Sequence, residues 1–249
     1  MSFTSFFSRM SPVTKNLVII NVLVWLFMAV VPSSKVSIDS FLALHYFTSP
    51  GFNIVQLFTY MFIHSGFTHM FLNMFALVMF GSVIENALGS KRFLVYYISC
   101  GIGAALIQEG VFGLMIAKYS NMFSPADYQD IISRGFEALK HNMNFTDPTA
   151  AKLNELVNTP MVGASGAVYG VLLAFGVLFP NQPIYLMFIP VPIKAKWMVV
   201  GYVVIELVCG VGGYASSVAH FAHLGGMLVG FLLIMYWKKR GDLNNHWFF

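Results

Sequence analysis

Charged side chains are scarce in this chain. They make up 10% of its 249 residues, against about 25% in an ordinary soluble domain. Hydrophobic residues make up 57%, and the mean hydropathy is +0.72. A surface with so few charges does not suit a soluble protein, so the composition predicts an integral membrane protein in contact with the lipid bilayer.

Cysteine is also rare. The two cysteines, Cys100 and Cys209, both lie in apolar stretches, which argues against a disulfide framework and favours packing roles. The net charge of +4 comes from Lys and Arg between apolar stretches and gives no reason to expect a nucleic-acid partner.

Apolar stretches of about 20 residues, long enough to cross a bilayer, recur along the chain. They are continuously apolar, without the alternation of a barrel strand, and therefore predict helices. The expected fold is all-α, a polytopic bundle of six transmembrane helices that forms a single membrane domain over residues 1–249. The predicted spans cover approximately residues 15–31, 67–88, 91–114, 163–180, 194–212 and 218–237.

The positions of Lys and Arg predict the orientation. When the spans alternate across the membrane, one side carries Arg9, Lys15, Lys91, Arg92, Lys194, Lys196, Lys238, Lys239 and Arg240. The other side carries Lys35, Lys118, Arg134, Lys140 and Lys152. The positive-inside rule then places both termini in the cytoplasm of a cell whose cytoplasmic membrane holds this multi-pass protein.

Two connecting segments have a character of their own. Residues 32–66 are rich in aromatic residues and suit an interfacial or partly embedded segment, whereas residues 118–160 form a polar outer loop. Within this loop, Ser124-Pro125 and Asp147-Pro148 each predict an N-cap followed by proline, and hence two short helices. The first helix has an apolar stripe that favours a position on the membrane surface over a solvated spacer. The stripe comprises Tyr128, Ile131, Ile132, Phe136 and Leu139.

Four polar residues are predicted to share one depth in the membrane. The second, fourth and sixth spans run inward from the outer face, and with a rise of about 1.5 Å per residue His69, Asn73, Ser165 and His223 all fall in their outer part. Polar side chains within a bilayer are costly and are candidates for function.

The chemistry that fits these residues is nucleophilic catalysis. His223 is the candidate base for the hydroxyl of Ser165. All Asp residues lie outside the spans, so we expect a Ser-His dyad without a third member. His69 and Asn73, four residues apart, share a helix face on which both can donate hydrogen bonds to one oxyanion.

Other intramembrane chemistries fit less well. The chain has no H-E-x-x-H motif for a zinc protease and no pair of Asp residues within its spans. A metal site of His64, His69, His220 and His223 is an alternative, but it leaves Ser165 and Asn73 without a role. We therefore expect no metal and no cofactor.

Two further residues have competing interpretations. His220 is the rival base, but it lacks the following glycine that His223 has, and we expect a structural or water-facing role. Glu206 lies in the fifth span, where an unpaired charge is disfavoured. We expect it to be protonated or hydrogen-bonded to a neighbouring helix, in helix pairing rather than in a proton relay.

Glycines suggest both close packing and a movable cover. Gly166 with Gly170, and Gly226 with Gly230, form small-xxx-small patterns; if these two faces meet, they bring Ser165 and His223 together. The glycine-containing segment 210–217 is expected to act as a lid, with sideways movement of the fifth span admitting substrate.

Three motifs, in this order, resemble the signature set of the rhomboid family of six-helix intramembrane serine proteases. They are His64-x4-His69-x3-Asn73, Gly163-Ala-Ser165-Gly166 with Tyr169 following, and Ala222-His223-x2-Gly226-x3-Gly230. With Glu85, Gly89 and the glycine-lined spans included, the resemblance covers five of the six predicted helices.

The resemblance implies a role for each motif residue. Ser165 would be the nucleophile, His223 the general base, and His69, Asn73 and the Ser165 backbone amide the oxyanion hole. Tyr169 would stack on His223, and His64 would support the loop before the second span. The implied activity is endopeptidase cleavage of single-pass or other membrane-protein substrates, in or near a transmembrane segment, through an acyl-enzyme.

Two other functions are alternatives. A non-catalytic relative that binds and escorts membrane proteins would not need both Ser165 and His223. A small transporter would show an inverted repeat around a midplane site, and the polar residues here lie off-centre.

Overall fold

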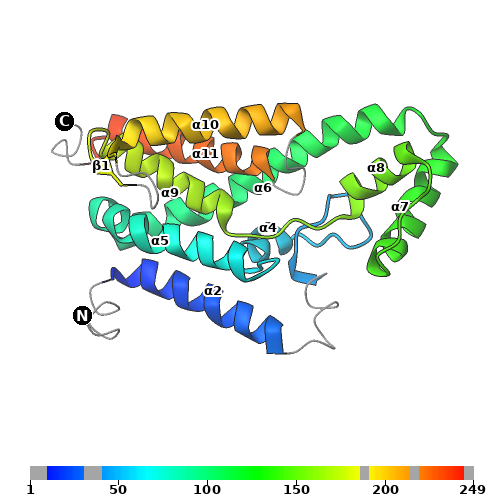
Figure 1. Cartoon of the computed structure of the whole chain (residues 1–249), viewed down its shortest axis with the longest axis horizontal. Helices are drawn as coiled ribbons and strands as arrows, with labels where there is room; N and C mark the ends of the chain where they lie inside the picture. Colours follow the sequence, from blue (N-terminus) through cyan, green and yellow to red (C-terminus); the bar gives the residue numbers. More distant parts are fainter. Residues whose placement is uncertain (1–9, 31–40, 186–190, 214–218, 244–249) are drawn as a thin grey trace.

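The computed structural model of the chain describes residues 10–30, 41–185, 191–213 and 219–243. Helices dominate these residues, and one short hairpin joins them (Figure 1). In chain order the elements are α2 (Pro12–Val30), α4 (Gln56–Thr59), the 3-10 helix η1 (Tyr60–Phe62), α5 (Phe67–Leu88), α6 (Ser90–Ser120), α7 (Pro125–Lys140), α8 (Pro148–Asn158), α9 (Ser165–Leu178), β1 (Pro183–Ile184), β2 (Ile193–Lys194), α10 (Ala195–Gly212) and α11 (His220–Lys239).

The described part of the chain confirms the predicted class of fold, a polytopic helical membrane protein. Five of its helices, α2, α5, α6, α10 and α11, are long and apolar enough to cross a membrane, and α9 is a shorter apolar helix. Each of the six predicted spans overlaps one of these helices.

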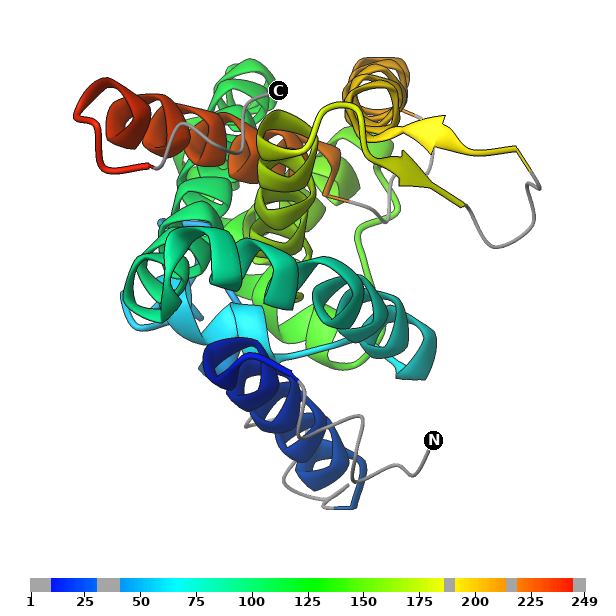
Figure 2. The ribbon, with the colours of Figure 1, turned by 90° about the vertical axis from the view of Figure 1, so that its left-hand side faces the viewer.

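Helix α9 is the centre of the bundle. It packs against α5, α6, α10 and α11, which surround it in the end-on view of Figure 2. Its 14 residues rise about 21 Å, less than the roughly 30 Å of a bilayer core. In Figure 1, where the bundle lies on its side, α9 begins short of the right-hand ends of α5 and α10.

Two glycines allow α9 and α11 to touch. A side chain added at Gly226 would collide with the backbone carbonyl of Gly166. The small-xxx-small faces thus meet as predicted, because only hydrogen at this position leaves room for the crossing.

A carboxylate from α5 caps the N-terminus of helix α2. Glu85 is 1% exposed, and its Oε2 accepts hydrogen bonds from the backbone N–H of Thr14 at 2.7 Å and from its hydroxyl at 2.8 Å. Its Oε1 accepts from the N–H of Val13 at 3.0 Å. These N–H groups have no partner within their own helix, and the negative charge suits a helix N-terminus. Glu85 thereby joins the first span to the second.

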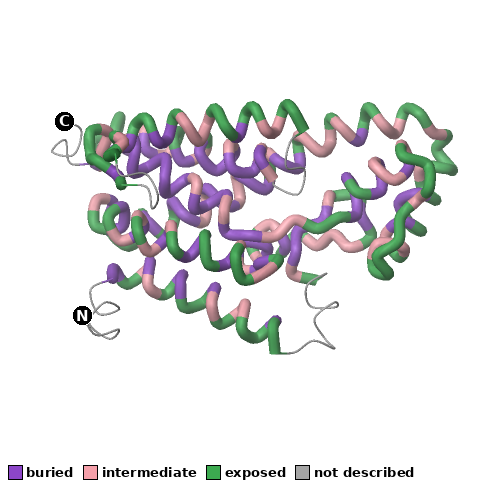
Figure 3. Tube along the Cα trace, viewed as in Figure 1, coloured by how far each residue is buried: buried purple, intermediate pink, exposed green. Residues whose placement is uncertain are grey.

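Helix α6 extends past the predicted end of its span, from Ser90 to Ser120, and supports a second, smaller core with α7 and α8. Both helices begin at their predicted caps, Ser124 and Asp147. The expected surface position of α7 is wrong. Ile131 and Ile132 of its stripe are buried in this core (Figure 3), because α8 and the end of α6 cover them.

The segment before α5 is tied to the bundle by its backbone. Leu44 and Met161 pair as an isolated antiparallel bridge, and the carbonyl of Tyr60 accepts a hydrogen bond from the N–H of Gly163 at 3.0 Å. The Tyr60 hydroxyl donates to the carbonyl of Gly101 in α6 at 2.7 Å. The chain that leads into α9 is therefore fixed two residues before Ser165.

Candidate active site

Ser165 is the first residue of α9. It follows Gly163, whose φ of +125° is a conformation that residues with a side chain rarely adopt. In the outer half of α9 only Ser165 and Tyr169 are incompletely buried. The hydroxyl therefore lies on the part of the outer half of α9 that a reactant can approach.

His223 lies opposite this serine, in the first turns of α11. Its Nε2 is 2.8 Å from the Oγ of Ser165, a hydrogen-bond distance that suits proton transfer. Two contacts place the ring: the crossing of α9 and α11 at Gly166 and Gly226, and a hydrogen bond of 3.0 Å from the N–H of Ala222 to Oε1 of Gln108 in α6. Gln108 supplies a cap that the sequence analysis missed.

Tyr169 stacks on the ring of His223. The ring centroids are 4.1 Å apart and the planes differ by 5°. Tyr169 lies one turn after Ser165 on α9, so the same helix carries both the hydroxyl and the aromatic ring that stacks on His223. This confirms the stacking that the resemblance implied.

Glu206 of α10 provides a carboxylate behind His223. Its Oε1 is 3.0 Å from Nδ1 of His223 and 2.6 Å from the hydroxyl of Tyr169, and its Oε2 is 2.6 Å from Nδ1 of His220. The expectation of hydrogen bonding to neighbouring helices is confirmed. The expectation that no carboxylate accompanies the pair is wrong, because it considered Asp alone.

His220 is buried rather than water-facing, since its ring points to Glu206 from the first turn of α11. The two histidines share one carboxylate, but only His223 reaches the serine. The sequence could have revealed Glu206 by its depth: it lies about 9 Å from the outer end of α10 at a rise of 1.5 Å per residue, as deep as the other site residues.

Of the residues predicted for the oxyanion hole, His69 lies beside Ser165, whereas the amide of Asn73 is turned elsewhere. A side chain added at Gly163 would be 2.8 Å from Nε2 of His69 and 3.7 Å from Oγ of Ser165, so His69 and Ser165 border the same glycine. The ring is held by Ser65, whose Oγ is 3.0 Å from Nδ1. The amide of Asn73 instead donates to the carbonyl of His69 at 2.9 Å.

His64 lies outside the helices and contacts His69 edge to face, with ring centroids 5.1 Å apart. It is 9% exposed, and neither ring nitrogen has a hydrogen-bond partner among the described residues. Burial, with the nearby His69, lowers the pKa of His64 to about 4. The ring is therefore neutral at physiological pH and packs beneath His69.

The comparison with protein families decides the identity of this fold. The family model described as the rhomboid domain matches residues 51–240, which is more than half of the chain. The chain belongs to the rhomboid family.

Several curated proteins are similar to this rhomboid. It is 28% identical to Rhomboid protein 1, mitochondrial, of Saccharomyces cerevisiae over 72% of the present chain and 40% of the yeast protein. It is 28% identical to Rhomboid protease AarA of Providencia stuartii, over 88% of this chain and 70% of that one. It is 25% identical to the Putative rhomboid protease YdcA of Bacillus subtilis, with 94% of each covered. The rhomboid thus spans less than half of the yeast protein.

The four histidines of the alternative metal site form two groups in the rhomboid rather than one site. Glu206, His220 and His223 have ligand atoms within 4.8 Å of one another, close enough to hold a metal ion. His64 and His69 pair separately. The donors of the first group already hydrogen-bond to one another, so the protein alone satisfies them.

The expected lid lies partly outside the described residues. Gly210, Val211 and Gly212 continue α10, and Gly213, with a φ of +68°, ends it. Residues 214–217 lie outside the described residues. The structure therefore describes only residues 210–213 of this segment, which form the end of α10.

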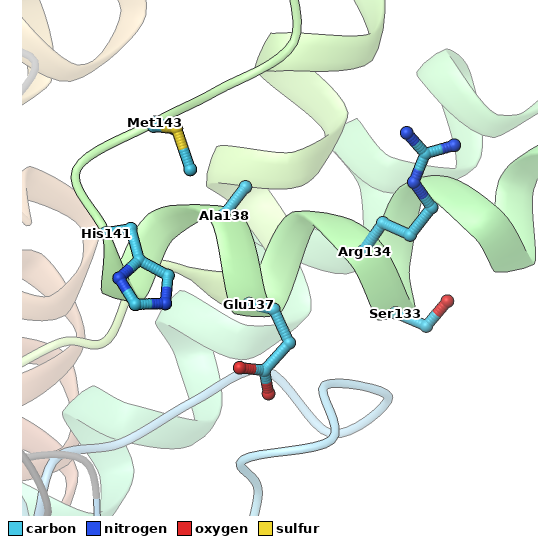
Figure 4. Close-up of a pocket in the computed structure, with 6 residues that line it drawn as sticks. All are labelled: Ser133, Arg134, Glu137, Ala138, His141 and Met143. Carbon is cyan, nitrogen blue, oxygen red and sulfur yellow. The ribbon is translucent and has the colours of Figure 1, made fainter.

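Two hollows lie away from these residues in the rhomboid. One, of about 450 Å³, is bordered by α7 residues, Met143 and His141, as Figure 4 shows. The other, of about 490 Å³, lies between α5, the end of α9 and β1. Neither is lined by Ser165 or His223, so the reactive pair is identified by its hydrogen bond and not by a cavity.

Proposed function

We propose that this rhomboid is an intramembrane serine endopeptidase whose single membrane domain covers residues 1–249. The observation that carries the proposal is the 2.8 Å contact between Oγ of Ser165 and Nε2 of His223. A serine hydroxyl reacts only when a neighbouring base takes its proton, and a neutral imidazole is the usual base near neutral pH. No metal or other cofactor is needed for this reaction.

The reaction forms and then hydrolyses an acyl-enzyme. Oγ of Ser165 attacks the carbonyl carbon of the peptide bond while its proton passes to Nε2 of His223, which then protonates the leaving amine. The developing oxyanion accepts hydrogen bonds from the N–H of Ser165, which has no partner inside α9, and from His69. Asn73 joins them by rotating away from the carbonyl it contacts. Water, activated by His223, releases the acyl group.

The proposed substrates are single-pass or other membrane proteins, cleaved in or near a transmembrane segment. We place the enzyme in the cytoplasmic membrane with both termini inside and the site toward the outer face, on the distribution of Lys and Arg. The name of the yeast relative describes that protein as mitochondrial. The substrate would enter between α5 and α10, past the exposed outer half of α10.

Covalent labelling tests the proposal. Purified protein in detergent is treated with a fluorophosphonate, and wild type is compared with Ser165→Ala and with Ser133→Ala, an exposed serine of α7 whose hydroxyl bonds to Gln129. We expect labelling of wild type and Ser133→Ala, and none of Ser165→Ala. Equal labelling of all three would remove Ser165 from the mechanism.

Cleavage of a reconstituted membrane substrate separates the enzyme from an escort protein. We expect wild type to cut the substrate and His223→Ala, which still binds it, to leave it intact. A wild-type protein that binds the substrate in liposomes without cutting it would favour the non-catalytic alternative.

A further inference from the structure

Glu206 is a buried acidic residue inside the helical bundle. It is 4% exposed and lies in a helix long and apolar enough to cross the membrane. Burying a carboxylate is costly unless hydrogen bonds compensate it. Tyr169, His220 and His223 supply three, and all three come from the helices that carry the reactive pair.

Glu206 is the one buried contact in the outer half of α10. After Val199, Glu206 is the only buried residue of the helix, and the rest of its outer half is partly or fully exposed. Apolar packing does not account for a carboxylate at this position. A Leu would bury more apolar surface there, so the charge points to a role that a hydrocarbon side chain does not serve.

We propose that Glu206 is a positioning residue that completes a Ser165–His223–Glu206 triad. This inference rests on the proposed endopeptidase function and adds a third member to the pair. Glu206 acts through His223 and does not touch the substrate.

The carboxylate selects one orientation and one tautomer of the imidazole. Stacking on Tyr169 fixes the plane of the His223 ring. It does not distinguish the two orientations of that ring that differ by a 180° rotation about the Cβ–Cγ bond, because both stack almost equally well. The hydrogen bond from Nδ1–H to Oε1 of Glu206 distinguishes the two orientations, since only one places nitrogens at both ends. With the proton on Nδ1, the lone pair of Nε2 faces Oγ of Ser165.

The same contact stabilises the charged form of His223 during the reaction. When the Ser165 proton moves to Nε2, the imidazolium keeps its Nδ1 proton hydrogen-bonded to the carboxylate, and that proton is not transferred. The Nε2 proton then passes to the leaving amine. His220 and Tyr169 hold the carboxylate in place from the other directions, at 2.6 Å each.

An isosteric substitution tests this role. Glu206→Gln keeps the shape, but a neutral amide has one acceptor oxygen for three donors and turns an N–H₂ toward one of them. The matched control is Glu109→Gln, a buried glutamate of α6 that accepts the N–H of Phe47 at 3.3 Å and lies outside the site. Cleavage rates and substrate concentration dependence are measured on a reconstituted membrane substrate, with thermal unfolding of each variant in detergent.

We expect kcat of Glu206→Gln to fall by about 10² to 10⁴, as when the acid of a serine protease triad is replaced by its amide. KM should stay within threefold, and Glu109→Gln should keep the wild-type kcat. Glu206→Asp retains the charge on a shorter arm and should recover at least tenfold in kcat over Glu206→Gln.

The outcomes separate this inference from the function on which it rests. A wild-type protein that neither labels with a fluorophosphonate nor cuts would refute the endopeptidase itself. If the wild type is active and a folded Glu206→Gln has wild-type kcat, the triad is overturned and Glu206 serves only in helix pairing. If Glu206→Gln does not fold, a folded Glu206→Asp decides: reduced kcat at unchanged KM supports the triad, and wild-type kcat overturns it.

Discussion

At the scale of the residue, Gly163 combines two constraints. Its φ of +125° disfavours any side chain, and an added methyl group would lie 2.7 Å from Cε1 of His69. We predict that Gly163→Ala lowers cleavage by about 10², comparable with the loss of an oxyanion donor, because the ring of His69 must move. Steady-state cleavage of a membrane substrate measures this loss.

Gly89 offers a matched control. Its φ is also positive, at +80°, but a side chain added there meets nothing within 4 Å. Gly89→Ala should cost stability of about 1–2 kcal/mol from backbone strain and keep activity within twofold. Equal activity losses in the two variants would show that strain, and not the contact with His69, is responsible.

His64 should make the protein sensitive to acid. Its folded pKa of about 4 lies below the ordinary value of about 6.5, so the unfolded chain binds more protons between these two values. Stability is then unaffected above pH 6.5 and falls as the pH drops, by about 2 kcal/mol at pH 5. His64→Leu should reduce the difference in thermal midpoint between pH 7.5 and pH 5. An unchanged difference would contradict this explanation.

The sequence motifs predicted which residues of the candidate site lie together, wherever a local pattern is sufficient. Ser165, Tyr169 and His223 are placed by motifs whose spacing survives folding, and the structure brings all three together. The depth of Glu206 could be read from the sequence, but its contact with His223 could not, because that contact depends on the rotation of α10 about its axis. The exposed outer half of that helix carries no amphipathic pattern that fixes this rotation.

At the scale of the element, the junction of α2 and α5 depends on Glu85. Glu85→Ala would leave the N–H groups of Val13 and Thr14 without their acceptor, and we predict a loss of about 3 kcal/mol in the free energy of unfolding. The control is Glu137→Ala, which breaks the exposed ion pair with Lys140 and should cost less than about 1 kcal/mol. Denaturant unfolding in detergent measures both, and equal losses would mean that the cap contributes nothing special.

Helix boundaries were predictable where a cap or an apolar run defines them. The second span, predicted at 67–88, has those bounds in the structure. The stripe of α7 was assigned to the wrong partner, since a stripe of this kind fits a membrane surface and a neighbouring helix equally well. Only the tertiary arrangement shows that α8 and the end of α6 cover it.

At the scale of the whole molecule, the proposed topology places α7 and the end of α11 on opposite sides of the membrane. With Cys100 and Cys209 replaced by Ala, we predict that Ser133→Cys reacts with a membrane-impermeant maleimide in intact cells expressing the protein. Lys239→Cys should react only after lysis. The reverse pattern would invert the orientation, and reaction of both in intact cells would contradict six crossings.

The position of Glu206 has a consequence for the order of events in turnover. One carboxylate both aligns His223 and fastens the outer half of α10 to α9 and α11. If a substrate helix displaces α10 to reach Ser165, the same movement separates the carboxylate of Glu206 from His223. Substrate entry and hydrolysis would then alternate. A bound polypeptide that keeps α10 displaced would hold the enzyme in an inactive form, so binding of a substrate alone would not lead to its cleavage.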